Sequence, residues 1–188
     1  MYPRPPLNEE PVVPNSREGK SEAAFQKALN FTLKHEGGYV NHSKDPGGET
    51  KFGISKASYP RENIKDLTKN RAAELYRKDY WNKMKASDMP EPIAMLAFDM
   101  AVNHGVSRAT KMIQKVVGAK TDGIVGKKTL KKISQSFNNN PISLIDRIVE
   151  GRRDFYRSLR TYETFGRGWD ARAIATSTEA KSIFDGEI

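Results

Sequence analysis

Ile93-Ala-Met-Leu-Ala-Phe-Asp-Met-Ala-Val-Asn-His104 follows two prolines and precedes Gly105. Nearly every residue in this stretch is apolar, so the sequence predicts a helix that lies at the centre of the core. Segments with helical spacing flank it on both sides, and no alternating strand pattern appears beyond a short loop region around residues 51–54. The predicted fold class is therefore mainly α, with a small β or loop element after the first helix and a helical second lobe.

The other helices are predicted from apolar periodicity and capping residues. The first is expected to begin at the N-cap Ser21 and to end near Glu36, where Gly37-Gly38 permits a left-handed turn. Further helices are expected at about 69–85, from Ser107 to about Val117, and at about 127–135, 142–160 and 169–184. Residues 1–20 contain five of the ten prolines and are predicted to form an extended arm. After this arm, the sequence predicts a first lobe over 21–105 and a helical C-terminal lobe over 106–188.

Composition excludes several classes of protein. The chain has 188 residues and a mean hydropathy of −0.71, and no stretch is long and apolar enough for a membrane span. It has no Cys, which excludes disulfides and thiolate zinc sites. His35 and His42 match no zinc spacing, so neither a metal nor a cofactor is expected. Residues 1–20 lack the apolar run of a signal peptide.

The net charge of +9 is concentrated in one part of the chain. Between Arg108 and Lys132, eight Lys and Arg accompany the single acidic residue Asp122. A basic face attracts polyanions, which include nucleic acid and the phosphates and stem-peptide carboxylates of bacterial envelopes. A solvated helix face also explains the charge. Nucleic acid is disfavoured as a partner because only Phe137 lies nearby for stacking and no recognition motif is present.

Two carboxylates stand close together after the first predicted helix, in Glu36-Gly-Gly-Tyr39 and Asp45-Pro-Gly-Gly48, with Thr50 just beyond. Glu36 falls in the last helical turn, where the backbone carbonyls should raise its pKa and keep it protonated. Asp45 lies in a polar, glycine-rich loop and should stay ionised. Such a pair suits the cleavage of a glycosidic bond. Taken singly, each residue also fits an ordinary helix end or turn.

These motifs and Phe52-Gly-Ile-Ser55 together resemble the N-terminal signature of glycoside hydrolase family 108, the N-acetylmuramidases of phages and some bacteria. The resemblance covers about 21–184, and its later motifs are Phe98–Gly105, Asp122–Leu130 and Phe165–Arg172. It implies a lysozyme-like α fold and a catalytic lobe over 21–105. It also implies hydrolysis of the β-1,4 bond between N-acetylmuramic acid and N-acetylglucosamine in peptidoglycan, with Glu36 as the catalytic acid. The region of Asp122–Leu130 resembles a part of the family described as peptidoglycan-binding.

The order Glu36, Asp45, Thr50 also resembles the triad of phage-type lysozymes, in which Asp and Thr position the hydrolytic water. The interval from Asp45 to Thr50 is one residue shorter here. Asp45 is therefore expected to act as the base or as an electrostatic stabiliser, and Thr50 to orient water. Inversion is favoured over retention because a small Thr beside the Asp suggests room for a water molecule.

Five further residues are candidates for sugar contacts. Tyr39, Gly53 and Tyr59 lie in or near the glycine-rich loop, where backbone and aromatic rings can approach a glycan. Asp99 and Asn103 share one face of the predicted central helix and could bond sugar hydroxyls or N-acetyl groups. The alternative is that Asn103 ends the helix and Asp99 bonds a neighbouring residue.

Two other functions remain open. A lytic transglycosylase needs one acid and base Glu and no partner that activates water, and a non-catalytic wall-binding or virion protein could keep the same fold. Residues 1–20 could tether the domain to a phage tail or baseplate protein. In the absence of a signal peptide, the enzyme is expected to be made in the host cytoplasm and to reach the wall through holin-made holes or on the virion.

Overall fold

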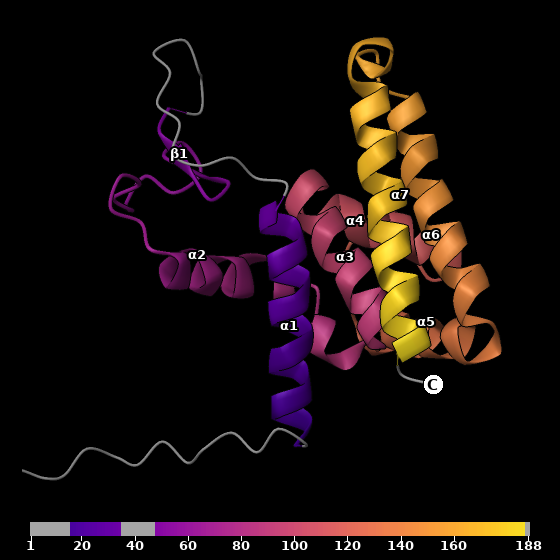
Figure 1. The fold of residues 1–188 in the computed structure, drawn as a ribbon. Helices are drawn as coiled ribbons and strands as arrows, with labels where there is room; N and C mark the ends of the chain where they lie inside the picture. Colours follow the sequence, from indigo (N-terminus) through magenta and orange to yellow (C-terminus); the bar gives the residue numbers. More distant parts are fainter. Residues whose placement is uncertain (1–15, 35–47, 187–188) are drawn as a thin grey trace, which may run out of the picture.

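The computed structural model describes residues 16–34 and 48–186. This part of the chain forms seven α-helices, two short helical turns and one small sheet, which lies at the edge of the molecule (Figure 1). The α-helices are α1 (Arg17–Lys34), α2 (Lys69–Tyr76), α3 (Glu91–His104), α4 (Val106–Val117), α5 (Lys127–Asn139), α6 (Pro141–Arg157) and α7 (Tyr162–Gly186). The sheet pairs β1 (Thr50–Lys51) with β2 (Ile54–Ser55), and the turns are η1 (Arg77–Trp81) and η2 (Ala86–Asp88). The predicted class, mainly α with a small β element and a helical second lobe, is confirmed.

Helix α3 is the centre of the core, as its sequence predicted. It contacts α1, α4, α6, α7 and both short helical turns, and every residue from Pro92 to Ala101 is buried. The ring of Phe98 meets the rings of Phe25, Tyr76 and Trp81 edge-on, with centroids 5.8 to 6.1 Å apart. Such edge-on pairs each add about 0.5–1.5 kcal/mol to the burial of their surface. Helix α3 therefore joins the N-terminal and C-terminal halves of the molecule.

Helix α1 begins earlier than the sequence predicted. The expected N-cap was Ser21, but the helix starts at Arg17 because the Ser16 hydroxyl accepts the N–H of Gly19 at 3.0 Å. Residues 17–20 are thus helical, although they were expected to belong to the extended arm. The Ser21 hydroxyl instead donates to the Ser87 hydroxyl at 2.7 Å and ties α1 to η2.

The β1–β2 hairpin occupies the predicted extended region. Thr50 stands opposite Ser55 in an antiparallel pair, and Phe52 and Gly53 form the two-residue turn between the strands. Both turn residues have positive φ, 53° and 72°, which this kind of hairpin turn requires. A positive φ is unfavourable for a bulky residue such as Phe52. The Tyr76 hydroxyl donates to the Phe52 carbonyl oxygen at 2.9 Å, which fixes the turn against α2.

The helix predicted over 69–85 is interrupted. Its expected start is correct, since the Thr68 hydroxyl accepts the N–H of Arg71 at 3.1 Å as an N-cap. The regular α-helix ends at Tyr76, and a π-helical turn follows over Arg77–Trp81. This turn places Trp81 in the core, where its Nε1–H donates to the Ser87 hydroxyl at 2.8 Å.

Helices α6 and α7 form an antiparallel hairpin that stands beside α3 (Figure 1). Helix α7 was expected from residue 169 but begins at Tyr162, so Gly166 and Gly168 are helical. A Cβ on Gly166 would lie 2.5 Å from a ring carbon of Tyr162. Glycine there lets the Tyr162 ring pack flat on the helix, and its hydroxyl then donates to Asp170 at 2.7 Å.

The start of α4 also differs from the prediction. The helix was expected from Ser107, but Val106 is already helical, and Gly105 precedes it at a φ of 79°. A glycine at positive φ ends α3 and starts α4 without a cap from Ser107. Within the described ranges, 16–34 and 48–186, no helix is long and apolar enough to cross a membrane.

Candidate active site

The candidate acids lie in a segment bounded by two well-defined elements. Glu36, Tyr39 and Asp45 fall outside the described residues, so their predicted roles and the raised pKa of Glu36 remain predictions. The segment follows the last residue of α1, Lys34, and the described chain resumes two residues before Thr50. Helix α1 and the β1–β2 hairpin are therefore the two supports between which the acids are attached.

Thr50 lies at the start of β1 with its side chain half-buried. Its hydroxyl donates to the Gly48 carbonyl oxygen at 3.5 Å, the outer limit of a hydrogen bond. In the described part of the chain no shorter bond engages this hydroxyl. The pairing of Thr50 with Ser55 fixes the backbone, while the hydroxyl keeps the capacity to hold a water molecule.

Gly53 and Tyr59 follow in the same region, at different depths. Gly53 is exposed at the hairpin turn. The Tyr59 ring is half-buried and its hydroxyl donates to Asp79 Oδ2 at 3.1 Å. Burial, together with the neighbouring Tyr80 and Asp79, raises the pKa of Tyr59 well above its ordinary value, so it remains a neutral phenol. Because the hydroxyl is engaged by Asp79, any contact of Tyr59 with a sugar falls to its ring.

Asp99 lies inside the protein. Its side chain is completely buried, and Arg152 Nη1 of α6 donates to Oδ2 at 2.7 Å while Arg172 Nη2 of α7 donates to Oδ1 at 2.8 Å. The Thr176 hydroxyl also donates to Oδ2 at 3.3 Å. Both carboxylate oxygens are thus used within the core. Asp99 therefore bonds neighbouring residues, as one of the two expectations for it stated, and neither of its carboxylate oxygens is left for a sugar hydroxyl.

The cluster of Asp99, Arg152 and Arg172 is charged despite its burial. Burial alone would raise the pKa of Asp99, but the two guanidinium groups outweigh it and hold the pKa below its usual range. Sequence reasoning did not identify the two arginines. One signal was present, because Arg152 occupies a position within the apolar stripe of α6, between Ile148 and Tyr156.

His104 and Asn103 end α3 beside this cluster. His104 Nε2 accepts a hydrogen bond from Arg152 Nε at 3.2 Å, and burial followed by the charge of Arg152 lowers the pKa of His104 to about 4. The imidazole is therefore neutral near pH 7. Asn103 is exposed, and its side-chain amide donates to the Asp99 carbonyl oxygen at 2.7 Å. The Asn103 side chain folds back on the last helical turn and keeps its carbonyl oxygen accessible.

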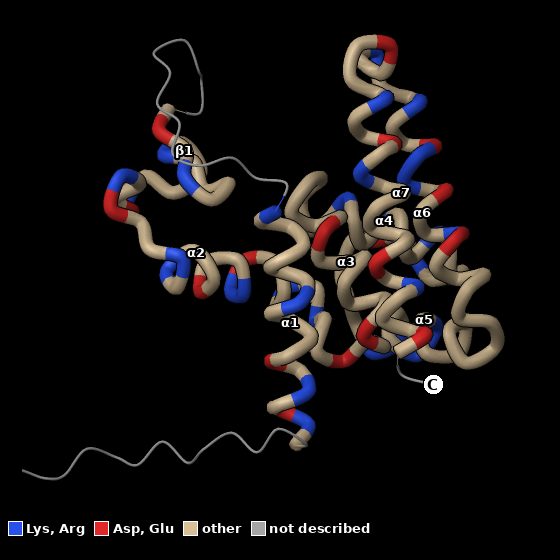
Figure 2. The backbone as a smooth tube through the Cα atoms, viewed as in Figure 1, with Lys and Arg blue, Asp and Glu red and all other residues tan. Residues whose placement is uncertain are grey.

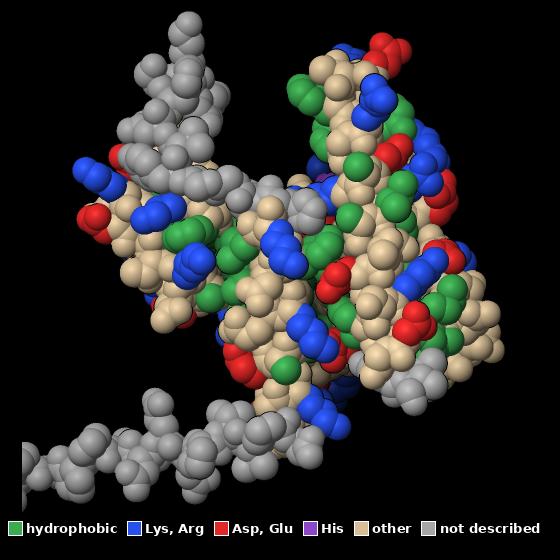
Figure 3. Space-filling model, in the orientation of Figure 1, with side chains coloured by type: hydrophobic (Ala, Val, Ile, Leu, Met, Phe, Trp, Pro, Cys, Tyr) green, Lys and Arg blue, Asp and Glu red, His purple; other side chains and the backbone are tan. Residues whose placement is uncertain are grey.

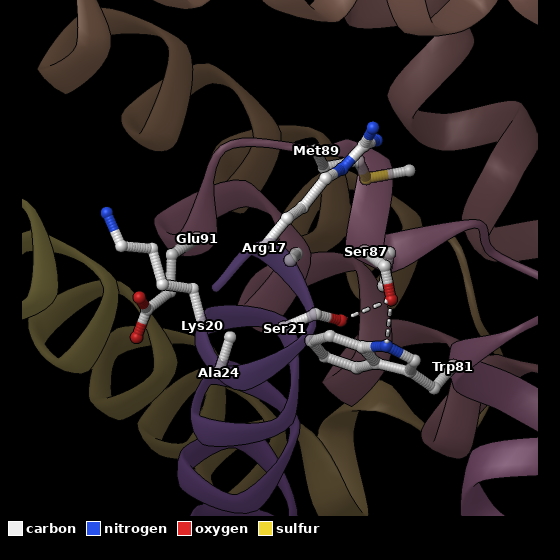
Figure 4. A pocket seen from close by; sticks show the side chains of 10 residues that line it. Arg17, Lys20, Ser21, Ala24, Trp81, Ser87, Met89 and Glu91 are labelled. Atoms are coloured by element: carbon white, nitrogen blue, oxygen red, sulfur yellow. Dashed lines mark hydrogen bonds between the residues drawn. The ribbon is translucent and has the colours of Figure 1, made fainter. Parts of the chain in front are cut away.

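A separate pocket of about 410 Å³ lies at the other end of α1 (Figure 4). Ser87, Trp81 and Met89 form part of its wall. The pocket lies near Arg17, and the rise of an α-helix puts Arg17 about 25 Å from the Lys34 end of α1. Its only acidic residue is Glu91, which pairs with Lys27 at 2.8 Å. This pocket therefore offers no pair of carboxylates for acid and base chemistry. Among residues 16–34 and 48–186, no group of His, Asp or Glu could hold a metal ion.

Comparison with known proteins assigns both halves of the chain to described families. A family model named glycosyl hydrolase 108 matches residues 29–105. A second family model, described as a predicted peptidoglycan domain, matches residues 108–174. A solved structure described as that of Brucella abortus SagA has a TM-score of 0.75 and 36% sequence identity, and the match covers 86% of this chain and 95% of that one. No curated protein matches.

Proposed function

Because the chain belongs to the glycosyl hydrolase 108 family and is a glycoside hydrolase that acts on peptidoglycan, we propose that it is a muramidase. It cleaves the β-1,4 bond between N-acetylmuramic acid and N-acetylglucosamine. The observation that carries this proposal is the family match over residues 29–105, which contains Glu36, Asp45 and Thr50 together. The lysozyme-like fold supports it, since α1 and the hairpin support the segment that bears the acids.

The proposed reaction is a hydrolysis with one acid and one base. Glu36, in its protonated form, gives a proton to the leaving glycosidic oxygen as the bond to the sugar breaks. Asp45 removes a proton from the attacking water, and the Thr50 hydroxyl orients that water. The weak bond of Thr50 to the Gly48 carbonyl leaves its hydroxyl available for this role. Attack from the opposite face inverts the sugar, which needs carboxyl groups about 6.5–9.5 Å apart.

The glycan contacts are proposed for Gly53, Tyr39, Tyr59 and Asn103. Gly53 at the exposed hairpin turn lets the backbone approach a sugar, and the rings of Tyr39 and Tyr59 offer stacking surfaces. The free carbonyl oxygen of Asn103 can accept the N–H of an N-acetyl group. Asp99 serves this site indirectly, because its backbone carbonyl holds the Asn103 amide.

The Glu36→Gln variant tests the assignment of the acid. We expect it to lose lysis of purified sacculi while its circular dichroism and melting temperature stay those of the wild type. Glu74→Gln is the matched control, because Glu74 is 66% exposed in the same lobe and only pairs with Arg71 at the surface. Near-wild-type lysis by Glu36→Gln would remove Glu36 from the mechanism, and inactivity of the wild type would favour a non-catalytic wall-binding protein.

We further propose that the enzyme is phage-encoded, as an endolysin or a tail-associated lysozyme, and that the proline-rich part of residues 1–20, which precedes α1, contacts a tail or baseplate protein. The concentration of prolines in these residues supports an extended tether. Deletion of residues 1–15 should leave lysis by the free protein unchanged and prevent its incorporation into virions. Equal incorporation with and without these residues would contradict the tether.

A further inference from the structure

The C-terminal lobe contains an open hollow of about 810 Å³ between the loop before α5 and the exposed face of that helix. Ile124 is 71% exposed in its wall, which is unusual for a large apolar side chain. Five lysines line the same hollow, namely Lys120, Lys127, Lys128, Lys131 and Lys132. Figure 2 shows basic positions along α5. The hollow thus combines a strong positive charge with one apolar contact surface.

These lysines are unpaired, unlike the basic residues of the neighbouring hairpin. Within the described residues none of the five forms an ion pair, whereas Arg153 and Arg157 of α6 each bond to two carboxylates. Basic and acidic side chains accordingly lie beside one another along α6 and α7 (Figure 3). The positive charge of the hollow therefore remains available to a partner outside the chain.

The one acidic residue in the wall is already engaged. Asp122 accepts hydrogen bonds from Gln114 Nε2 at 2.8 Å and from the N–H of Ile124 at 3.0 Å. The Gln114 side-chain oxygen in turn accepts the N–H of Gly123 at 2.9 Å. This buried glutamine and Asp122 fix the loop that presents Ile124. The wall is therefore held in shape by the protein, and its one carboxylate leaves most of the positive charge of the five lysines uncompensated.

The arrangement of these lysines does not favour the helix that carries them. Lys127 and Lys128 occupy the first turn of α5, which has no acidic residue, and positive charge near a helix N-terminus opposes the helix dipole. Lys131 and Lys132 repeat the charge one turn later on the same faces, where like charges repel. A local arrangement that costs stability without an internal partner is typical of a functional surface.

We propose that this hollow binds the stem peptides of peptidoglycan. Their carboxylates would pair with the lysines, and their alanine methyl groups would contact Ile124. The proposal rests on peptidoglycan being the substrate and names the part of it that the second lobe recognises. A glycan backbone alone carries too little charge to account for five lysines. Nucleic acid fits less well, because no aromatic side chain lines the hollow to stack on a base.

Binding of a stem peptide would give the enzyme a preference among glycan strands. Helix α3 joins the first lobe to the second, so a strand cut by the first lobe would be held through its peptides by the second. The enzyme should therefore act on strands that carry peptides and bind strands without them less tightly. This preference is separate from the identity of the bond that is cleaved.

Sedimentation with insoluble sacculi tests the proposal. The sacculi are stripped of attached polymers, and their stem carboxylates are either left intact or converted to neutral amides. The test variant is Lys127→Gln with Lys128→Gln and Lys131→Gln. The control variant is Lys65→Gln with Lys69→Gln and Lys78→Gln, which removes the same charge from exposed positions of the first lobe.

We expect the wild type to bind amidated sacculi about tenfold more weakly than intact ones, which is what three exposed ion pairs are typically worth together. The test variant should bind intact sacculi about tenfold more weakly, and the control variant should stay within about twofold of the wild type. Thermal melting confirms that both variants are folded. Binding is measured in the cold with products monitored, so it is read independently of hydrolysis.

Several outcomes would overturn the proposal. Equal binding of the wild type to intact and amidated sacculi would exclude recognition of the carboxylates. Equal loss in the test and control variants would show a dependence on net charge alone. Stronger binding to anionic phospholipid vesicles or to duplex DNA than to intact sacculi, lost in the test variant, would assign the hollow to another partner. None of these results would alter the proposed bond specificity, which is read from the reaction products.

Discussion

The molecule contains two clusters of charged side chains that differ in burial and in pairing. Around Asp99 the charges are buried, and both Arg152 and Arg172 bond directly to its carboxylate. Around Ile124 five lysines surround an open hollow and none is paired within the described residues. Arginine is used in the first region, where planar donors satisfy a carboxylate, and lysine in the second, where charge stays hydrated.

The difference separates a structural role from a binding role. A buried charge without its partner is strongly unfavourable, so the Asp99 cluster must remain intact for α3, α6 and α7 to pack. An exposed lysine loses little when its neighbours change, so the hollow can be altered without harm to the fold. The two regions should therefore respond in opposite ways to the removal of charge, and each substitution below tests that contrast.

The largest effect is expected for Asp99→Ala. The change leaves the buried Arg152 and the largely buried Arg172 without their carboxylate, which should lower the free energy of unfolding by about 3–5 kcal/mol. Urea denaturation measures the loss. Asp146→Ala is the control, since Asp146 is 54% exposed and pairs with Lys181 at the surface, where about 1 kcal/mol or less is expected. Similar losses in both variants would contradict the structural role of the Asp99 cluster.

A pH dependence is expected from His104. Its pKa is lowered from 6.5 to about 4 in the folded protein, because burial and Arg152 disfavour the imidazolium. As the pH falls, His104 therefore binds a proton in the unfolded chain before it does so in the folded protein. The free energy of unfolding that is present above pH 6.5 is lost as the pH falls toward 4.

The variant His104→Gln should flatten this decline, because it removes the titrating group. Urea denaturation of both proteins at several pH values between 6.5 and 4 measures the difference in slope. The lowered pKa of Asp99 contributes mainly at still lower pH, where its carboxylate becomes protonated. Parallel declines in the wild type and the variant would show that His104 is not the group that titrates.

A smaller loss is expected for Gly123→Ala, between Asp122 and Ile124 in the loop before α5. Gly123 has a φ of 79°, and an added Cβ would lie 2.6 Å from the Ser107 hydroxyl oxygen. We expect the free energy of unfolding to fall by about 1–2 kcal/mol. Gly126→Ala is the control, because nothing lies within 4 Å of its added Cβ and its φ of −106° is ordinary. Equal stability of the two variants would show that this loop is not held as described.

The smallest effect, and one of opposite sign, is expected for the triple substitution of Lys127, Lys128 and Lys131 by Gln. Removal of positive charge from the first turns of α5 relieves repulsion and the conflict with the helix dipole. The free energy of unfolding should stay unchanged or rise by about 0.5–1 kcal/mol, as measured in urea. A clear loss of stability would mean that these lysines support the fold, and the contrast with Asp99 would disappear.

The sequence predicted the elements that follow from local patterns. The apolar run before Gly105 identified α3 and its central place, and the expected helix start at residue 69 agrees with the start of α2 at Lys69. Starts that depend on packing were missed. Helix α7 begins at Tyr162 because the ring of that residue packs on Gly166. Glycine has a low intrinsic helix propensity, so the local sequence did not indicate that residues 162–168 are helical.

The candidate site divides in the same way. Glu36 and Asp45 are predicted as the acids from a compact motif of residues close in the sequence, and their roles stay predictions. Asp99 bonds Arg152 and Arg172, which lie more than fifty positions from it in the sequence and on two other helices. Only the packing of those helices brings the three together, so a single sequence indicates an unusual Arg152 but not its partner.

Mass spectrometry of muropeptides released from purified sacculi in isotopically labelled water tests the central claim most directly. A muramidase adds one atom of labelled oxygen to each new reducing end, and that end is N-acetylmuramic acid. We predict this product for the wild type and its absence for Glu36→Gln. Anhydro-muramic ends without label would identify a lytic transglycosylase, labelled N-acetylglucosamine ends would identify a different bond, and either result would contradict the account.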